Sequence, residues 1–134
     1  MPIQPYLSFE GRADEAVEFY KKALGATVQM LMRFKEAPDQ SMISPGSGEK
    51  VMHAALKIGD ATVLLSDGRN SGKATFQGIN LTLYAKDPTE ADKVFNALAD
   101  GGEVRMPLGK TFFSPAFGML ADKFGVGWMI IVQP

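Results

Sequence analysis

The stretch KFGVGWMII, residues 123–131, has the same form as KIGDATVLL, residues 57–65. A shift of 66 positions places the two Lys-x-Gly triplets on each other, and an apolar run follows each triplet. A glycine turn that leads into an apolar run is typical of a hairpin and its second strand. The repetition therefore indicates that the chain contains two copies of one structural unit.

A helix is predicted in each copy from the spacing of its apolar residues. The stretches are DEAVEFYKKALGATV (14–28) and TEADKVFNALADGGEV (89–104), and in both the apolar residues recur every three or four positions. The stripes consist of Ala13, Val17, Tyr20 and Leu24 in the first helix, and of Ala91, Val94, Phe95 and Leu98 in the second. Gly25 supplies a left-handed stop. The motif DPTE at 87–90 supplies an N-cap aspartate, a first-turn proline and a capping-box glutamate.

Short segments with strand character surround both helices. They lie at 3–9, 27–35, 50–58, 61–66, 78–84, 102–108, 113–121 and 126–133. The order of strand, helix and three strands, repeated, predicts an α+β fold of two tandem βαβββ modules, about 1–67 and 78–134, within one domain of residues 1–134. In 78–84, apolar residues alternate with Asn80, Thr82 and Tyr84, so the polar set should face away from the helix.

Composition excludes several classes of function. Of the 134 residues, 46% are hydrophobic, and the formal net charge is -1. This balance argues for a globular domain and against a nucleic-acid partner. The absence of Cys excludes disulfides and thiolate sites. No apolar run reaches the roughly 20 residues that cross a bilayer, and MPIQPYLSF does not read as a signal peptide, so we expect a cytoplasmic protein.

Three stretches resemble the vicinal oxygen chelate superfamily of glyoxalases, bleomycin-resistance proteins and extradiol dioxygenases, and within it the PhnB-like branch. They are PYLSFEGRADEAVEFYKKALGA (5–26), VMHAALKIGDATVLLSD (51–67) and TFFSPAFGMLADKFGVGWMI (111–130). The resemblance implies a curled, cup-like mixed sheet with the helices on its outer face and a ligand inside against a divalent metal. The branch usually has Phe-Trp-Gly where this chain has 112–114, Phe-Phe-Ser, at an implied pocket edge.

The four strand positions that the resemblance implies for metal ligands carry unsuitable residues. Aligning the strands by helix and turn signatures places Pro5, Val63, Asn80 and Met129 there. Zn, Ni and Fe sites are built from imidazole, carboxylate or thiolate ligands, and the amide of Asn80 is at best a weak carbonyl donor. The chain has a single histidine, His53. We therefore expect neither a metal nor another cofactor.

Two further residues have alternative interpretations. His53 shares the more polar face of its strand with Ala55 and Lys57, either as a structural residue or as one that hydrogen-bonds a ligand or acts as a base. Arg33, in an otherwise apolar strand, either faces solvent or clamps a carboxylate or phosphonate. The predicted ligand pocket comprises Arg33, His53, Asn80, Thr82, Tyr84, Phe113 and Met129.

Three functions are weighed. The first is binding of a small molecule in the cup without metal chemistry, as in bleomycin-resistance proteins. The alternative is a metal-dependent glyoxalase-like lyase, isomerase or dioxygenase. A methyltransferase, a label given to some PhnB-like chains, is disfavoured because no glycine-rich nucleotide turn occurs. We also expect a symmetric homodimer that covers the sheet edges, with a pocket in each chain or shared between chains. Loops 35–50 and 67–77 are either lids or tolerated insertions.

Overall fold

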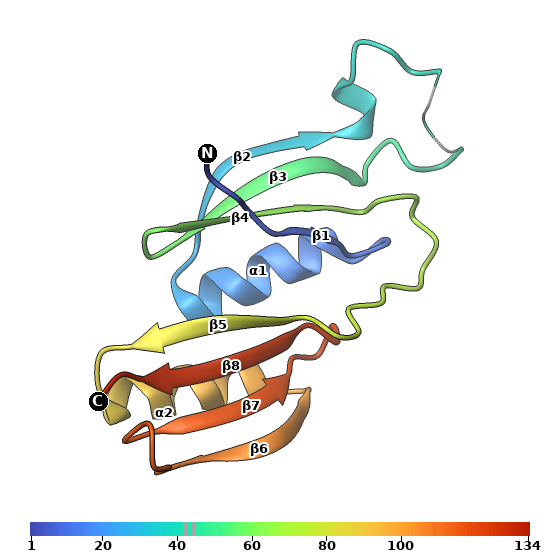
Figure 1. The fold of residues 1–134 in the computed structure, drawn as a ribbon. Helices are drawn as coiled ribbons and strands as arrows, with labels where there is room; N and C mark the ends of the chain where they lie inside the picture. Colours follow the sequence, from blue (N-terminus) through green and yellow to red (C-terminus); the bar gives the residue numbers. More distant parts are fainter. Residues whose placement is uncertain (42, 44) are drawn as a thin grey trace. The chain divides into compact units, whose positions relative to one another are not determined.

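A computed structural model of the chain describes residues 1–41, 43 and 45–134 (Figure 1). The chain divides into two compact units, residues 1–74 and 75–134. The first contains β1 (Tyr6–Ser8), α1 (Ala13–Leu24), β2 (Thr27–Arg33), the short 3₁₀ helix η1 (Phe34–Glu36), β3 (Val51–Ile58) and β4 (Ala61–Ser66). The second contains β5 (Asn80–Ala85), α2 (Pro88–Ala99), β6 (Glu103–Gly109), β7 (Phe117–Ala121) and β8 (Gly127–Val132).

Both units have the same sheet topology. The strand order is β1-β4-β3-β2 in the first sheet and β5-β8-β7-β6 in the second. The first strand of each unit runs parallel to the last, and the other neighbours are antiparallel. The predicted α+β fold of two tandem βαβββ modules is therefore confirmed.

The helix ends follow the local sequence. α1 ends at Gly25, which has a left-handed φ of 66° and donates its N–H to the carbonyl oxygen of Lys21. At the start of α2, Asp87 Oδ1 accepts a 2.8 Å hydrogen bond from the backbone N–H of Glu90. The Glu90 carboxylate accepts from the backbone N–H of Lys86, one residue before the one that a capping box would use. The predicted caps are thus confirmed apart from this shift.

Each helix covers one face of its own sheet. In the second unit, a Cβ at Gly118 of β7 would lie 2.7 Å from the Phe95 ring of α2, so this close approach needs glycine. Side chains buried on this side include Phe95, Leu98, Leu120, Trp128, Ile130 and Val132. In the first unit the corresponding side includes Leu7, Phe9, Val17, Tyr20, Ala54, Leu56, Val63 and Leu65. Full burial of a large apolar side chain contributes about 1.5–3 kcal/mol to stability.

Three predicted strand boundaries were wrong. The segment 3–9 forms a strand only at Tyr6–Ser8, and 27–35 is interrupted by η1 after Arg33. The segment 113–121 begins its strand at Phe117, because residues 111–114 close a turn through the side chain of Thr111. These ends depend on hydrogen bonds to other residues, which apolar spacing does not report.

Within the part of the chain that the structure describes, no helix combines the length and apolarity needed to cross a membrane.

Candidate functional site

The second sheet has an open face on the side away from α2. Side chains two residues apart in a strand share a face, so the paired residues of neighbouring strands form rows across the sheet. One row joins Thr82, Met129, Met119 and Met106, one from each strand in the order β5-β8-β7-β6. The open face of the second sheet comprises Asn80, Thr82, Tyr84, Glu103, Met106, Phe117, Met119, Ala121, Gly127, Met129 and Ile131.

The methionine row makes this face apolar and adaptable. Met106 is 44% exposed, and Met119 and Met129 are half-buried. The Thr82 hydroxyl lies 3.9 Å from the Met129 sulfur, so the hydroxyl points toward its neighbour in the row. Methionine is unbranched and polarisable, and it adapts to ligands of irregular shape. The row therefore provides a surface on which an apolar group can lie.

Aromatic side chains close one end of the open face. Phe113 packs edge-on against Phe117 with ring centroids 5.0 Å apart, and against Phe112 at 5.1 Å. Phe117 is buried and pairs with Ile131 of β8, which in turn pairs with the exposed Tyr84. Phe113 thus extends the open face beyond the end of β7.

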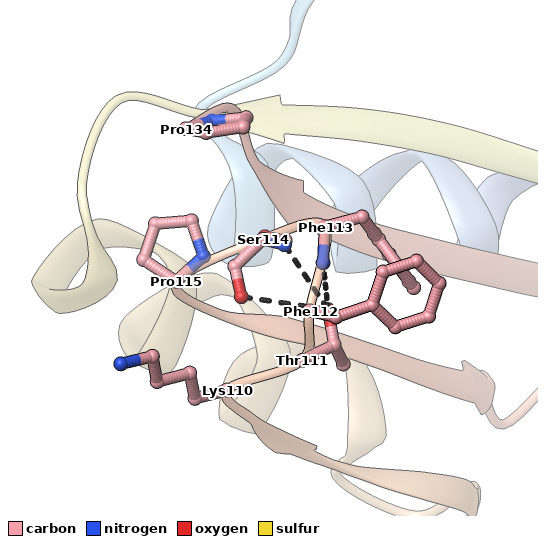
Figure 2. Close-up of a pocket in the computed structure, with 7 residues that line it drawn as sticks. All are labelled: Lys110, Thr111, Phe112, Phe113, Ser114, Pro115 and Pro134. Carbon is pink, nitrogen blue, oxygen red and sulfur yellow. Dashed lines mark hydrogen bonds between the residues drawn. The ribbon is translucent and has the colours of Figure 1, made fainter.

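A pocket of about 280 Å³ lies at this aromatic end (Figure 2). Its lining consists of Lys110, Thr111, Phe112, Phe113, Ser114, Pro115 and Pro134. Thr111 Oγ1 accepts hydrogen bonds from the backbone N–H groups of Phe113 and Ser114, at 3.3 and 3.1 Å. The Ser114 hydroxyl is buried and donates to the carbonyl oxygen of Val132. The turn is therefore held in place, and Ser114 is a structural residue.

The first sheet has its own open face, on the side away from α1. Tyr6, Leu64, Ala55 and Met30 form one row across its four strands. On this face the Tyr6 hydroxyl lies 3.1 Å from Nδ1 of His53. When the phenol donates this hydrogen bond, a neutral His53 carries its proton on Nε2, which then serves as a donor. His53 is thus held by Tyr6, a residue that the sequence pattern does not mark as a site residue.

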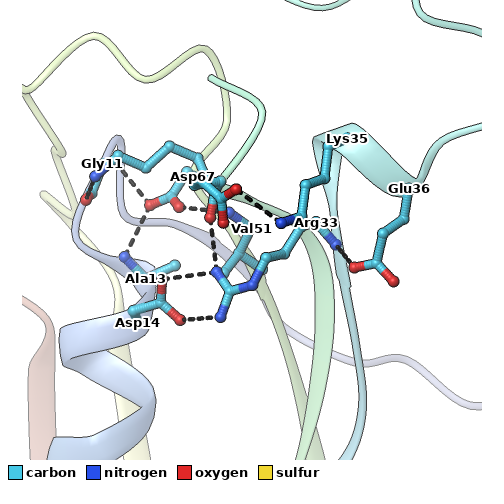
Figure 3. Close-up of polar contacts among 10 residues, drawn as sticks. Gly11, Ala13, Asp14, Arg33, Lys35, Glu36, Val51 and Asp67 are labelled. Atoms are coloured by element: carbon cyan, nitrogen blue, oxygen red, sulfur yellow. Dashed lines mark hydrogen bonds and ion pairs between the residues drawn. The ribbon is translucent and has the colours of Figure 1, made fainter. Parts of the chain in front are cut away.

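Arg33 is engaged within the first unit. Its guanidinium forms a bidentate ion pair with Asp14 of α1, at 2.9 and 3.0 Å, and donates to the carbonyl oxygen of Glu49 at 2.7 Å (Figure 3). The hydrogen bonds with Asp14 raise the pKa of Arg33 above its ordinary value. The Arg33 guanidinium therefore neither clamps a ligand nor simply faces solvent, the two roles that the sequence left open. It ties the end of β2 to the start of α1.

Asp67 is a fully buried carboxylate at the end of β4. Its Oδ1 accepts from the backbone N–H groups of Gly11 and Ala13, and its Oδ2 accepts from that of Val51, all at 2.8 Å (Figure 3). Asp67 therefore satisfies the first donors of α1 from outside the helix. With both oxygens occupied, it serves structure rather than proton transfer.

The alignment of the four candidate metal-ligand positions was wrong for both positions in the first unit, Val63 and also Pro5, which directly precedes Tyr6 of the open face. Val63 is paired with the fully buried Leu56 and lies on the α1 side of its sheet, whereas Met129 lies on the open face. The β3–β4 turn has two residues between its last paired residues, and the β7–β8 loop has five. Aligning the two chain halves by their glycine turns therefore shifted β4 by one residue relative to β8. A shift of one residue matches a residue on the helix side of one sheet with a residue on the open face of the other.

Correcting the register does not produce a set of hard-metal ligands. In the parallel strand pairs, the open faces present Tyr6 beside Leu64 in the first unit and Thr82 beside Met129 in the second. Among residues 1–41, 43 and 45–134, no group of three or more His, Cys, Asp or Glu side chains is placed to hold a metal ion.

The structure separates the predicted pocket residues into two sets. Arg33 and His53 lie in the first unit, and Asn80, Thr82, Tyr84, Phe113 and Met129 lie in the second. Arg105 of β6 is not among the predicted pocket residues, although it stands between Val104 and Met106 much as Arg33 stands in its own strand. An arginine within an otherwise apolar strand is the sequence feature that could have identified Arg105, and each unit contains one such arginine.

Comparisons with known proteins place the whole chain in context. The family model described as 3-demethylubiquinone-9 3-methyltransferase matches residues 2–131. Protein YjdN of Escherichia coli K12 is 36% identical, with 98% of this chain and 95% of that protein covered. Protein PA1353 of Pseudomonas aeruginosa has a TM-score of 0.87 at 36% identity, covering 99% of this chain and 98% of that one. The PhnB protein of Bacillus cereus has a TM-score of 0.82 at 30% identity, covering 99% and 100%.

A more distant likeness concerns the fold alone. A glyoxalase/bleomycin resistance protein/dioxygenase domain from Frankia sp. has a TM-score of 0.70 at 14% identity, covering 100% of this chain and 92% of that one. The family model and the relatives at 30% identity or more confirm the resemblance to the PhnB-like branch, and the distant likeness confirms the fold that the resemblance implied.

Proposed function

Because the chain belongs to the PhnB-like family described as 3-demethylubiquinone-9 3-methyltransferase, we propose that it binds a small amphipathic molecule on the open face of its second sheet. The observation that carries this proposal is the row of Met106, Met119 and Met129, which leaves three adaptable apolar side chains accessible on adjacent strands. Ligand sites are mostly apolar, with a few polar groups that fix orientation.

The aromatic end supports the same proposal. Phe113 and Phe117 form an edge-to-face aromatic pair beside the methionine row, and Tyr84 and Thr82 carry hydroxyl groups on exposed positions of β5. A flat apolar group packs well against aromatic rings, and a hydroxyl group orients one end of it. The face thus combines an apolar area with a polar margin.

Methyl transfer is not part of the proposal, although the family description names it. A cofactor with an anionic group commonly uses the free N–H groups at a helix N-terminus. Asp67 occupies those of Gly11 and Ala13 at α1, and Asp87 accepts from Glu90 at α2. These two carboxylates disfavour a second anion at either helix start.

The test uses Nile red, an uncharged dye whose fluorescence rises in apolar surroundings. We expect saturable binding, weakened roughly threefold to tenfold by Met119→Gln or Met129→Gln, because each replaces a thioether with an amide that must be desolvated. Met30→Gln, on the open face of the first sheet, is the matched control and should leave the affinity unchanged. Equal affinity in all four proteins, or no binding, would contradict the proposal. Native mass spectrometry of the freshly purified protein would identify a retained ligand.

We also propose that the chain forms a homodimer. The edge strand β6 has exposed Val104 and Met106, and the edge strand β2 has exposed Val28 and Met30. Edges that carry exposed apolar side chains are usually covered in soluble proteins. A second copy of the chain, in a closed symmetric pair, would provide this cover. A cytoplasmic location remains part of the proposal.

A further inference from the structure

Arg105 occupies an irregular position in β6. Val104 pairs with Leu120 and Met106 pairs with Met119, so Arg105 is the additional residue of a β-bulge. A bulge changes the direction in which a side chain projects, and bulges are common beside functional sites. β6 also contains Pro107, which an edge strand tolerates because one side of its backbone is unpaired. The local structure therefore orients Arg105 independently of the strand alternation.

The guanidinium of Arg105 lies over the open face of the second sheet. Gly127 shares this face with Met129, two residues along β8. A Cβ added at Gly127 would lie 3.3 Å from Nη1 of Arg105 and would also meet Oδ1 of Asn80. β7 lies between β6 and β8, so the arginine reaches across a strand. Glycine at 127 leaves space for both polar groups.

Arg105 differs from Arg33 in its partners. Arg33 is held by Asp14, whereas no carboxylate of the described residues lies within ion-pair distance of Arg105. The guanidinium adds a positive charge to a face whose other members are apolar or neutral apart from Glu103, which lies in the row of Ala121 and Gly127 but not within ion-pair distance of Arg105. Its planar fork matches the geometry of a carboxylate or phosphonate.

We propose that Arg105 binds the anionic head of the ligand, assisted by the amide of Asn80, while the apolar part lies along Met129, Met119 and Met106. This inference rests on the proposed function and adds the ligand class, an amphiphile with a carboxylate or phosphonate head. Gly127 and Met129 are two residues apart, which corresponds to about 6–7 Å along a strand. A ligand of modest length therefore reaches both the arginine and the methionine row.

The experiment compares three probes with the same alkyl chain, namely decanoate, decylphosphonate and decanol. Binding is followed through the methyl signals of methionine labelled with ¹³C, since three of these residues lie in the proposed site. We expect an anionic probe to bind about tenfold more tightly than decanol, because a hydrogen-bonded charge pair adds to the apolar contact. The preference for the anion should decrease at high salt, because the arginine is exposed.

Variants separate charge from position. Arg105→Met should remove the preference for the anionic probe and leave decanol binding unchanged, and Arg105→Lys should retain part of the preference. Lys93→Met, on the exposed side of α2, removes the same charge elsewhere and should have no effect. If only Arg105→Met loses the preference for the anionic probe over decanol, the inference is supported. The anion that binds more tightly to the wild type, decanoate or decylphosphonate, identifies the head group.

Other outcomes overturn it. If decanol and decanoate bind equally, or if Lys93→Met weakens decanoate as much as Arg105→Met does, the inference about the head group fails while the apolar site stands. If none of the three probes shifts the methionine signals, both the inference and the proposed function fail.

Discussion

The carboxylate of Asp67 accepts a 2.8 Å hydrogen bond from the backbone N–H of Ala13, although 54 residues separate the two in the chain. The same carboxylate accepts from Val51 at the start of β3. One buried side chain therefore joins the end of β4, the start of α1 and the start of β3, and it sets the arrangement of the first unit.

Replacing Asp67 with Asn should lower the free energy of unfolding by about 2–4 kcal/mol, because an amide group would place a second donor against the N–H of Val51 or of Gly11 and Ala13. Urea denaturation monitored by circular dichroism measures this change. Asp60→Asn, in the exposed turn after β3, is the matched control and should change stability by less than about 0.5 kcal/mol. Equal effects of the two variants would show that the cap is not stabilising.

Glu10 should contribute to stability in a pH-dependent manner. Its Oε1 accepts from the hydroxyl and the backbone N–H of Ser71, and the hydroxyl is the largest cause of the lowered pKa of Glu10. Because the pKa is lower in the folded state, the contribution is complete above the unfolded-state value of about 4.3 and is lost as pH falls through the folded value.

The measurement is urea denaturation of the wild type and Glu10→Gln at neutral pH and at successively lower pH. The variant should be less stable at neutral pH, and the difference should disappear in acid. Glu18→Gln, on the exposed side of α1, is the control. A difference that stays constant across the pH range would exclude ionised Glu10 as its source.

Thr111→Val should weaken dye binding through the turn at the aromatic end. The substitution keeps the shape of the side chain but removes the acceptor for the N–H groups of Phe113 and Ser114. We expect a roughly threefold loss of Nile red affinity as Phe113 loses its fixed position. Thr89→Val, in the exposed first turn of α2, should have no effect. Unchanged affinity in Thr111→Val would remove the turn from the proposed site.

Divalent metals should leave the protein unchanged. The corrected open-face positions offer a phenol, a hydroxyl and a thioether, which do not form the imidazole and carboxylate sets of Zn, Ni or Fe sites. Elemental analysis should find no stoichiometric metal, and Ni, Zn, Mn or Fe should shift the thermal midpoint by less than about 1 °C, since only a ligand that binds the native state stabilises it. A stoichiometric metal with clear stabilisation would favour the glyoxalase-like alternative.

Light scattering should give a mass twice the 14.5 kDa of one chain. The exposed apolar side chains of β2 and β6 supply the surface that a second copy would cover. Val104→Glu places a charge on edge strand β6 and should shift the mass toward that of a monomer. A monomeric wild type at the highest concentration measured would contradict the proposed dimer.

Several parts of the candidate site could be predicted from sequence, and others could not. The alternation of Asn80, Thr82 and Tyr84 correctly placed these residues away from the buried side of β5. Met129 belongs to the predicted pocket, but its alignment in one row with Met119 and Met106 depends on strand register. Arg105 was missed because a bulge cannot be read from the alternation of a single strand.

The sequence by itself determined the repeated βαβββ order, the end of α1, the start of α2 and the residue types available for chemistry, because caps, glycine stops and apolar spacing act within a few residues. The tertiary structure alone decided which face each strand presents, through the different lengths of the two final hairpins. It also decided that Arg33 is held by Asp14 while Arg105 extends over Gly127. These relationships join residues far apart in the chain, and a shift of one residue exchanges the two faces of a strand.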